Sequence, residues 1–77
     1  MIDSQLIGEE LRLLRNKMKK TAEEVSEEMK IHKNTLYKYE KDAADIPFEL
    51  FQKLLNYYNT NVSLFFKMIR EYNHKDE

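Results

Sequence analysis

Hydrophobic side chains recur at intervals of three or four over the first twenty residues. Such spacing places them on one face of a helix with 3.6 residues per turn. The members of this face are Ile7, Leu11, Leu14 and Met18. Asp3 or Ser4 can cap the start of the helix, because both side chains accept hydrogen bonds from free backbone amides. The pattern therefore predicts a first helix that ends near Lys19.

Two short helices are predicted over residues 21–41. Thr21 and Glu24 form the pattern S/T-x-x-E, in which each side chain accepts a hydrogen bond from the other residue's backbone amide. The helix that starts there buries Val25 and Met29, and it must be short because Ile31 breaks its period. A third helix of about two turns follows the polar residues 32–35.

Two longer helices are predicted in the second half of the chain. Residues 42–46 are expected to form a loop, and Pro47 stands where a first helical residue needs no amide hydrogen. The apolar face of the fourth helix consists of Phe48, Phe51, Leu54, Leu55 and Tyr58. Residues 59–61 supply turn and cap residues before a fifth helix over 62–72.

Composition indicates the fold class and its limits. The 77 residues contain one Gly and one Pro, and strands need turn residues to connect them, so we expect an all-α, compact five-helix bundle. A chain this short forms one domain, 1–77, with its core at about 4–72 and a frayed tail at 73–77. Without Cys there is no disulfide, thiolate metal site or catalytic thiol. We also expect neither a signal peptide nor a membrane-spanning segment, and a cytoplasmic protein.

Charge is nearly balanced overall but unevenly distributed. Thirteen Lys and Arg face fourteen Asp and Glu, for a net charge of −1, so no overall basic field attracts nucleic acid. Residues 9–20 hold five basic residues and two Glu, residues 21–29 hold four Glu and no base, and residues 30–41 hold four Lys and one Glu. The third helix is thus a small basic element in a near-neutral protein.

The polar residues of the third helix share one side. At roughly 100° per residue, they occupy an arc of about 140°, opposite Leu36 and Tyr39. The arc consists of Lys33, Asn34, Tyr37, Lys38 and Lys41. Such groups suit a DNA major groove, because Asn can bond adenine, Lys can donate to guanine or phosphate, and Tyr can contact phosphate or a thymine methyl. The alternative is a solvated helix face.

Residues 21–41 also resemble the helix-turn-helix of the lambdoid phage repressor and Cro family, or XRE-type family. Small Ser26 falls where the two helices of that motif cross, and apolar residues fall where it is buried. These apolar residues are Val25, Met29, Ile31, Leu36 and Tyr39. The flanking segments LRLLR (11–15), TLYKYEK (35–41) and DIPFEL (45–50) are similar to the family's first, third and fourth helices. The resemblance runs without a gap from about residue 7 to 66.

The resemblance implies a DNA-binding domain whose third helix enters the major groove while the second crosses the backbone. The implied base and phosphate contacts are His32, Lys33, Asn34, Tyr37, Lys38, Arg15, Lys41 and Thr21. In many members an Arg at the position of Arg15 pairs with a Glu at that of Glu40 and presents its guanidinium to a phosphate. A structural salt bridge without a DNA role is the alternative for this pair.

The sequence departs from the family pattern at three positions. Lys30 stands where a Gly usually forms the turn, and a left-handed Lys costs about 1 kcal/mol, so we expect a strained or altered turn. His32 replaces the Ser or Thr that caps the third helix, and we expect it to cap less well. Ala22 replaces a Gln that contacts phosphate in many members, beside four Glu that would repel the DNA backbone if they faced it.

The fifth helix has more apolar residues than one core contact requires. In the family this helix often forms a two-fold dimer, which would set two recognition helices about 34 Å apart. The expected interface residues are Phe66, Met68, Ile69 and Tyr72. The alternative is that the apolar residues on both sides of this helix are buried within one chain, those on one side against Leu13 of the first helix.

These features predict a sequence-specific DNA-binding transcriptional regulator. We expect a homodimeric repressor or autoregulator of a palindromic operator, of phage or mobile-element, restriction–modification controller or antitoxin type, with a second regulatory protein as a further possible partner. The alternative is a protein-interaction module on the same scaffold. No catalytic residue, metal site, cofactor, small-molecule ligand or membrane contact is expected, since the four Glu of residues 21–29 lack an accompanying His and neither His32 nor His74 has zinc spacing.

Overall fold

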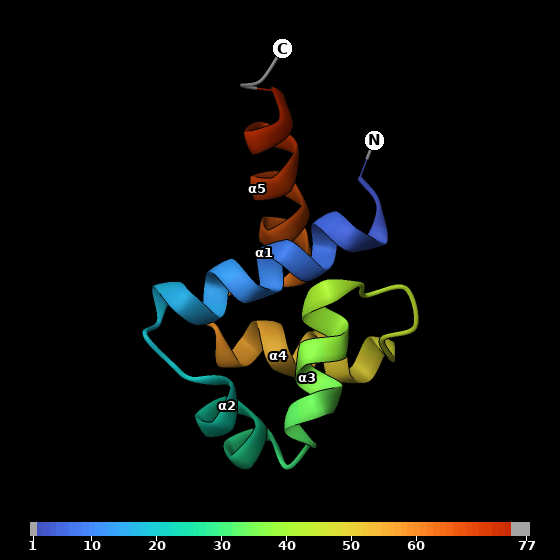
Figure 1. The fold of residues 1–77 in the computed structure, drawn as a ribbon. Coiled ribbons are helices and arrows are strands. Elements are labelled where there is room, and N and C mark those ends of the chain that lie inside the picture. Colours follow the sequence, from blue (N-terminus) through green and yellow to red (C-terminus); the bar gives the residue numbers. More distant parts are fainter. Residues whose placement is uncertain (1, 75–77) are drawn as a thin grey trace.

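Five α-helices joined by short connections make up the fold (Figure 1). The computed structural model describes residues 2–74, and the side chains of residues 2–71. Its helices are α1 (Ser4–Lys17), α2 (Ala22–Met29), α3 (Lys33–Lys41), α4 (Phe48–Tyr57) and α5 (Val62–His74). No strand occurs within 2–74, so the predicted all-α class is confirmed. No helix in this part of the chain is long and apolar enough to cross a membrane.

Local side-chain caps determine where three of the helices begin. The Asp3 carboxylate accepts a 2.9 Å hydrogen bond from the Leu6 amide, so Asp3 rather than Ser4 caps α1. Both bonds of the predicted capping box at the start of α2 are present. The Asn61 side chain accepts a 2.9 Å bond from the Leu64 amide at the start of α5. These bonds satisfy backbone amides that have no partner within the helix.

Three helix boundaries differ from the sequence prediction. The first helix ends at Lys17 because the chain turns at Lys19, which has a left-handed φ of 58°. Pro47 lies in extended conformation at the N-cap, one residue outside α4, and does not form its first turn. The fifth helix continues to His74, two residues into the segment expected to fray, and residues 75–77 lie outside the described chain.

The hydrophobic core lies where all five helices meet. The fully buried side chains are Leu11, Val25, Leu36, Leu54, Leu55, Phe65 and Ile69. Phe51 of α4 and Phe65 of α5 pack edge to face, with ring centroids 5.3 Å apart. Phe48, which the periodicity placed on the apolar face of α4, is instead 62% exposed because it stands at the first position of the helix, outside the core. In Figure 1, α2 and α3 lie at one end of the molecule and α5 extends from the other.

Gly8 allows α1 to cross directly over α3. A Cβ at this position would lie 2.5 Å from the Tyr39 carbonyl oxygen and 2.7 Å from the Glu40 carbonyl oxygen. Because both obstacles are backbone atoms, no side-chain rotation could make room. The absent side chain therefore sets the distance between α1 and α3, and with it the position of α3.

Candidate nucleic-acid interface

The exposed face of α3 contains the polar side chains that the sequence predicted to be there. His32, just before the helix, is exposed, as are all five residues of the polar arc. The opposite face buries Leu36, Tyr39 and Glu40. Among the described residues, one side chain of this face contacts an aromatic ring: the Lys38 ammonium lies 5.6 Å from the centroid of the Tyr39 ring. The helix thus presents cations, an amide and a phenol to solvent.

The turn between α2 and α3 has the geometry of a helix-turn-helix without its usual glycine. Lys30 adopts the left-handed conformation, with φ 58° and ψ 43°. The next amide, that of Ile31, donates a 2.9 Å hydrogen bond to the Ser26 carbonyl and closes the end of α2. His32 takes the N-cap position of α3 but makes no side-chain capping bond. A strained Lys and an uncapped helix start therefore replace the Gly and the Ser or Thr of the family pattern.

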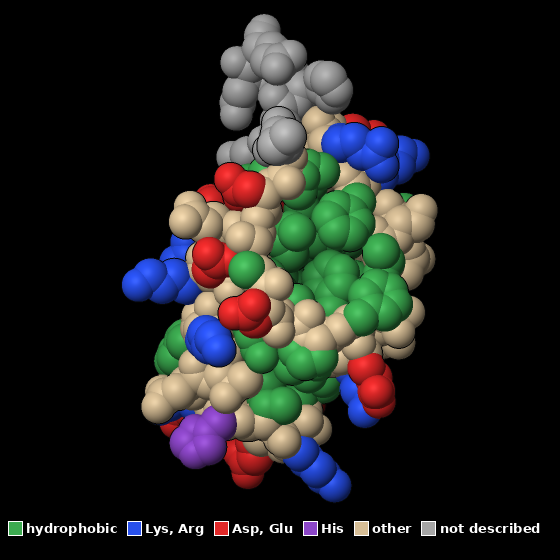
Figure 2. Space-filling view, turned by 90° about the vertical axis from the view of Figure 1, so that its right-hand side faces the viewer, with side chains coloured by type: hydrophobic (Ala, Val, Ile, Leu, Met, Phe, Trp, Pro, Cys, Tyr) green, Lys and Arg blue, Asp and Glu red, His purple; other side chains and the backbone are tan. Residues whose placement is uncertain are grey.

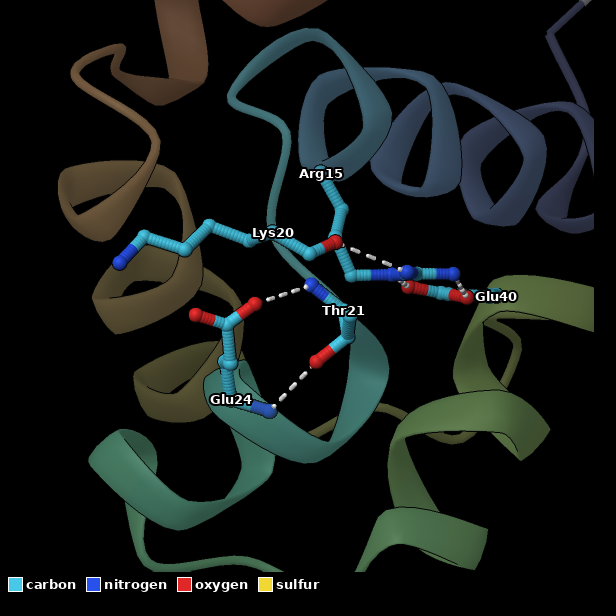
Figure 3. A network of polar contacts seen from close by, with 5 residues as sticks. All are labelled: Arg15, Lys20, Thr21, Glu24 and Glu40. Carbon is cyan, nitrogen blue, oxygen red and sulfur yellow. Dashed lines mark hydrogen bonds and ion pairs between the residues drawn. The ribbon is translucent and has the colours of Figure 1, made fainter.

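A buried ion pair holds α3 against α1. The Arg15 Nε donates to Glu40 Oε2 at 2.7 Å, and Nη2 donates to Oε1 at 3.0 Å, so the contact is bidentate (Figure 3). Arg15 Nη1 also donates to the Lys20 carbonyl oxygen at 3.1 Å. One guanidinium therefore links α1, α3 and the segment that leads into α2. The hydrogen bonds to Glu40 raise the pKa of Arg15, whose charge is permanent in any case.

This pair is largely removed from solvent. Its side chains are 11% and 3% exposed for Arg15 and Glu40, and Tyr58, at the C-cap of α4, is buried nearby. Burial raises the pKa of the Tyr58 phenol far above its ordinary value, with a further contribution from the Glu40 charge. Among the described residues, the Tyr58 hydroxyl has no hydrogen-bond partner. An ion pair in such a setting must keep both members, because one alone would be an uncompensated buried charge.

Thr21 lies beside this pair, at the start of α2 (Figure 3). Its hydroxyl oxygen accepts a 3.1 Å hydrogen bond from the Glu24 amide, and its own amide donates to Glu24 Oε1 at 2.9 Å. The bond from the Thr21 amide lowers the pKa of the Glu24 carboxyl. The Thr21 hydroxyl hydrogen is not used in the capping box. Ala22, where the family pattern has a phosphate-binding Gln, is buried in the core.

The four acidic residues of α2 are exposed, and the carboxylates of two of them accept hydrogen bonds. Glu24 belongs to the capping box, and Glu28 accepts a 3.0 Å hydrogen bond from the Tyr57 hydroxyl. The Lys20 ammonium lies 3.5 Å from Glu28 Oε2. Within the described part of the chain, no group of acidic and His side chains could hold a metal ion. The acidic face of α2 thus serves in part to fasten α2 to α4.

The structure divides the apolar residues of α5 differently from the sequence prediction. Ile69, expected at a dimer interface, is only 2% exposed and belongs to the core of its own chain, because the turn of α5 that contains it faces that core. Phe66 and Met68 are partly buried, and the side chain of Tyr72 lies outside the described residues. Leu64 is 48% exposed, and so is available for contact although it was not expected to be. Leu13, the residue of the first helix named in the alternative, is 44% exposed.

Hydrophobic side chains also gather on one side of the molecule, the side that Figure 2 faces. Phe66 belongs to an aromatic cluster, with its ring centroid 6.2 Å from that of Phe51 and 5.4 Å from that of Phe65. This arrangement leaves Phe66 with one side against the core and one side outward. A hydrophobic area of this kind is typical of a contact surface.

Sequence reasoning missed Arg12, which lines a groove between α1 and α3 together with Arg15, Tyr37 and Lys41. A signal for it was present, because Arg12 is three residues before Arg15 and therefore on the same side of α1. The relevance of that side depended on the position of α3, which only the folded chain shows.

Comparison with known proteins gives one match. A model of the family described as Helix-turn-helix matches residues 11–65, from the middle of α1 into α5. No curated protein matches the chain, and no solved structure does. The matched range includes α2, the turn, α3 and both members of the Arg15–Glu40 pair.

Proposed function

This chain belongs to the lambda-repressor-like, XRE-type helix-turn-helix family of DNA-binding transcription regulators, and we propose that it is a homodimeric repressor or autoregulator that binds a palindromic operator. The observation that carries the proposal is the exposed face of α3, where cationic and amide side chains face solvent on a helix that a buried ion pair fixes in place. A rigidly held recognition helix is what reading base edges requires.

The α3 side chains divide into two roles. Asn34, at the exposed N-terminal end of α3, is proposed to read base edges, since an amide can bond adenine with two hydrogen bonds. Tyr37 extends the same face, where a phenol can contact phosphate or a thymine methyl. His32, Lys33 and Lys38 surround these residues and are proposed to bind phosphates or guanine.

Arg15 has donors to spare for a phosphate. A guanidinium has five N–H groups. Three of them are used in the bonds to Glu40 and Lys20, which leaves one hydrogen on Nη1 and one on Nη2. Thr21 retains its hydroxyl hydrogen at the start of α2. We propose that both residues contact the DNA backbone and so fix α3 in the groove, while Lys41 contributes at the far end of α3.

The dimer is proposed to form through the apolar residues of α5 that its own core leaves wholly or partly exposed, on either side of the buried Phe65 and Ile69. Phe66 and Met68 are only partly buried, and Leu64 is exposed on the same helix. Burial of apolar surface would favour such an association by about 25 cal/mol per Å². A two-fold pairing would present two copies of α3 to successive major grooves about 34 Å apart. Control would then depend on the cytoplasmic concentration of the protein, because dimerisation and operator binding both follow mass action, or on a second regulatory protein.

Selection of duplexes from a random library, followed by fluorescence anisotropy over a salt series, tests this function. We expect a palindromic site that binds about 10³-fold or more tightly than random duplex DNA, with a steep negative dependence on salt. Asn34→Ala should lose about 1–3 kcal/mol of discrimination at one or two base pairs, whereas Lys33→Ala should weaken binding to all DNA. Lys53→Ala, on the exposed side of α4, is the charge-matched control. Equal, weak binding to every duplex would contradict the proposal.

A second candidate function is a protein-interaction module. The observation that favours it is the acidic face of α2 next to the basic face of α3, in a chain with a net charge of −1. Four exposed Glu close to the proposed DNA backbone oppose its approach. This candidate predicts that the Glu27→Gln substitution leaves DNA binding unchanged, because no specific complex exists, whereas an operator-bound protein should bind DNA more tightly when that charge is removed.

A further inference from the structure

A groove of about 650 Å³ runs between α1 and α3, beside the proposed DNA-binding face. Its walls combine Arg12 and Glu9 of α1 with Tyr37 and Lys41 of α3, and the Arg15–Glu40 pair also lines it. Of the residues that line it, Lys41 is the last of α3 and lies roughly 12 Å along the helix axis from Lys33, the first, so the groove extends from the middle of α3 to the end opposite Lys33. An anion bound there would be a different one from any bound near Lys33.

The charges of this groove favour an anion. Arg15 and Glu40 neutralise each other through their bidentate contact. Of the other charged side chains that line the groove, Arg12 and Lys41 are cations and Glu9 is an anion, and none of the three takes part in an ion pair among the described residues. The surplus is one positive charge, with the Tyr37 phenol as an additional donor.

We propose that this groove binds a DNA backbone phosphate, with Arg12 and Lys41 as its cationic partners and Glu9 as a carboxylate that limits the affinity. The inference rests on the proposed DNA-binding function and extends the contact surface along α1 from Arg15 to Arg12. Both cations are exposed, so they reach a phosphate without rearrangement of the core. Because phosphates carry no sequence information, the contact strengthens binding to every duplex alike.

Arg12 and Glu9 therefore have opposite expected effects. Removing the Arg12 charge deletes one phosphate contact, whereas removing the Glu9 charge deletes a repulsion at the same site. A merely structural role would not produce this opposition, because both residues are exposed on the same helix and separated by less than one turn. Two charge-matched controls exist on α1 outside the groove, namely Lys17→Ala for Arg12→Ala and Glu10→Gln for Glu9→Gln.

Fluorescence anisotropy over a salt series, with the selected duplex and a random duplex of equal length, tests the groove. Arg12→Ala should weaken binding to both duplexes by about two- to fivefold. It should also reduce the slope of log K against log salt by about 0.9, the value for one lost phosphate contact. Glu9→Gln should tighten binding to both duplexes by a similar factor. Circular dichroism melting should find all four variants folded.

Neutral methylphosphonate substitutions, placed one at a time along the selected duplex, would locate the contact. At one position the methylphosphonate should weaken DNA binding by the wild-type protein but leave DNA binding by the Arg12→Ala variant unchanged. If Arg12→Ala and Glu9→Gln behave like their controls while Lys33→Ala still weakens binding, the groove proposal is overturned and the DNA-binding function stands. If the wild-type protein shows no DNA binding above background, both are overturned.

Discussion

Replacing Gly8 with alanine should have the opposite of the usual effect of that substitution in a helix. Gly8 lies inside α1, where Gly is less favourable than Ala by about 1 kcal/mol, so an exposed position would gain that amount. Here the added Cβ would lie 2.5 Å, 2.7 Å and 2.9 Å from backbone atoms of Tyr39 and Glu40. An ordinary contact begins at 3.4 Å, so α1 and α3 would have to move apart by about 0.9 Å at this point.

The separation has a cost that exceeds the gain. Overpacking of a well-packed site costs about 1–3 kcal/mol, and a contact with backbone on both sides belongs at the upper end of that range. The same movement would strain the Arg15–Glu40 contact, because Glu40 lies at the collision point and its bond to Arg15 is 2.7 Å long. We therefore expect Gly8→Ala to lower the free energy of unfolding by about 1–2 kcal/mol.

Thermal unfolding followed by circular dichroism measures this effect. For a domain of this size, 1 kcal/mol corresponds to a shift in Tm of about 4–8 °C, so the expected decrease is about 5–15 °C. Asn16→Ala is the control, because its side chain is exposed on the same helix and the substitution should raise stability by about 0.5 kcal/mol. An unchanged or higher Tm for Gly8→Ala would refute the claim that backbone contact at Gly8 sets the spacing of α1 and α3.

Three further predictions concern stability. Glu40→Ala should lower the free energy of unfolding by about 3 kcal/mol in urea titrations, because Arg15 would remain as a buried unpaired charge, and a loss below 1 kcal/mol would count against a structural role for the pair. Lys30→Gly should raise stability by about 0.5–1 kcal/mol in the same assay, because Gly adopts the left-handed turn without strain, and a decrease would contradict this view of the turn. Hydrogen bonds from Thr21 lower the pKa of Glu24 in the folded state, so the stability they contribute is present at neutral pH and is lost as the pH falls below the ordinary carboxyl value. The Tm of Glu24→Gln should therefore fall less on acidification than that of the wild type, and parallel pH profiles would exclude this contribution.

The sequence by itself determined the helices and the character of their faces. Capping by Asp3, the Thr21–Glu24 box and the three- to four-residue apolar spacing act between residues close together in the chain, so they can be recognised without a fold. The polar arc of α3 is exposed for the same reason, because helix geometry alone places its residues opposite Leu36 and Tyr39. The resemblance to the helix-turn-helix pattern left a strained or an altered turn at Lys30, and the structure has the strained, left-handed one.

Only the tertiary structure decided which apolar residues of α5 are buried, and which exposed residues share a groove. Ile69 enters the core while Leu64 stays outside, because the side of α5 that meets α4 depends on the angle between the two helices and not on the sequence of either one. The need for a glycine at position 8, where α1 crosses α3, depends on backbone atoms more than thirty residues away in the chain. That same crossing brings Arg12 and Lys41 to one groove, since α1 and α3 lie side by side only after the core has formed.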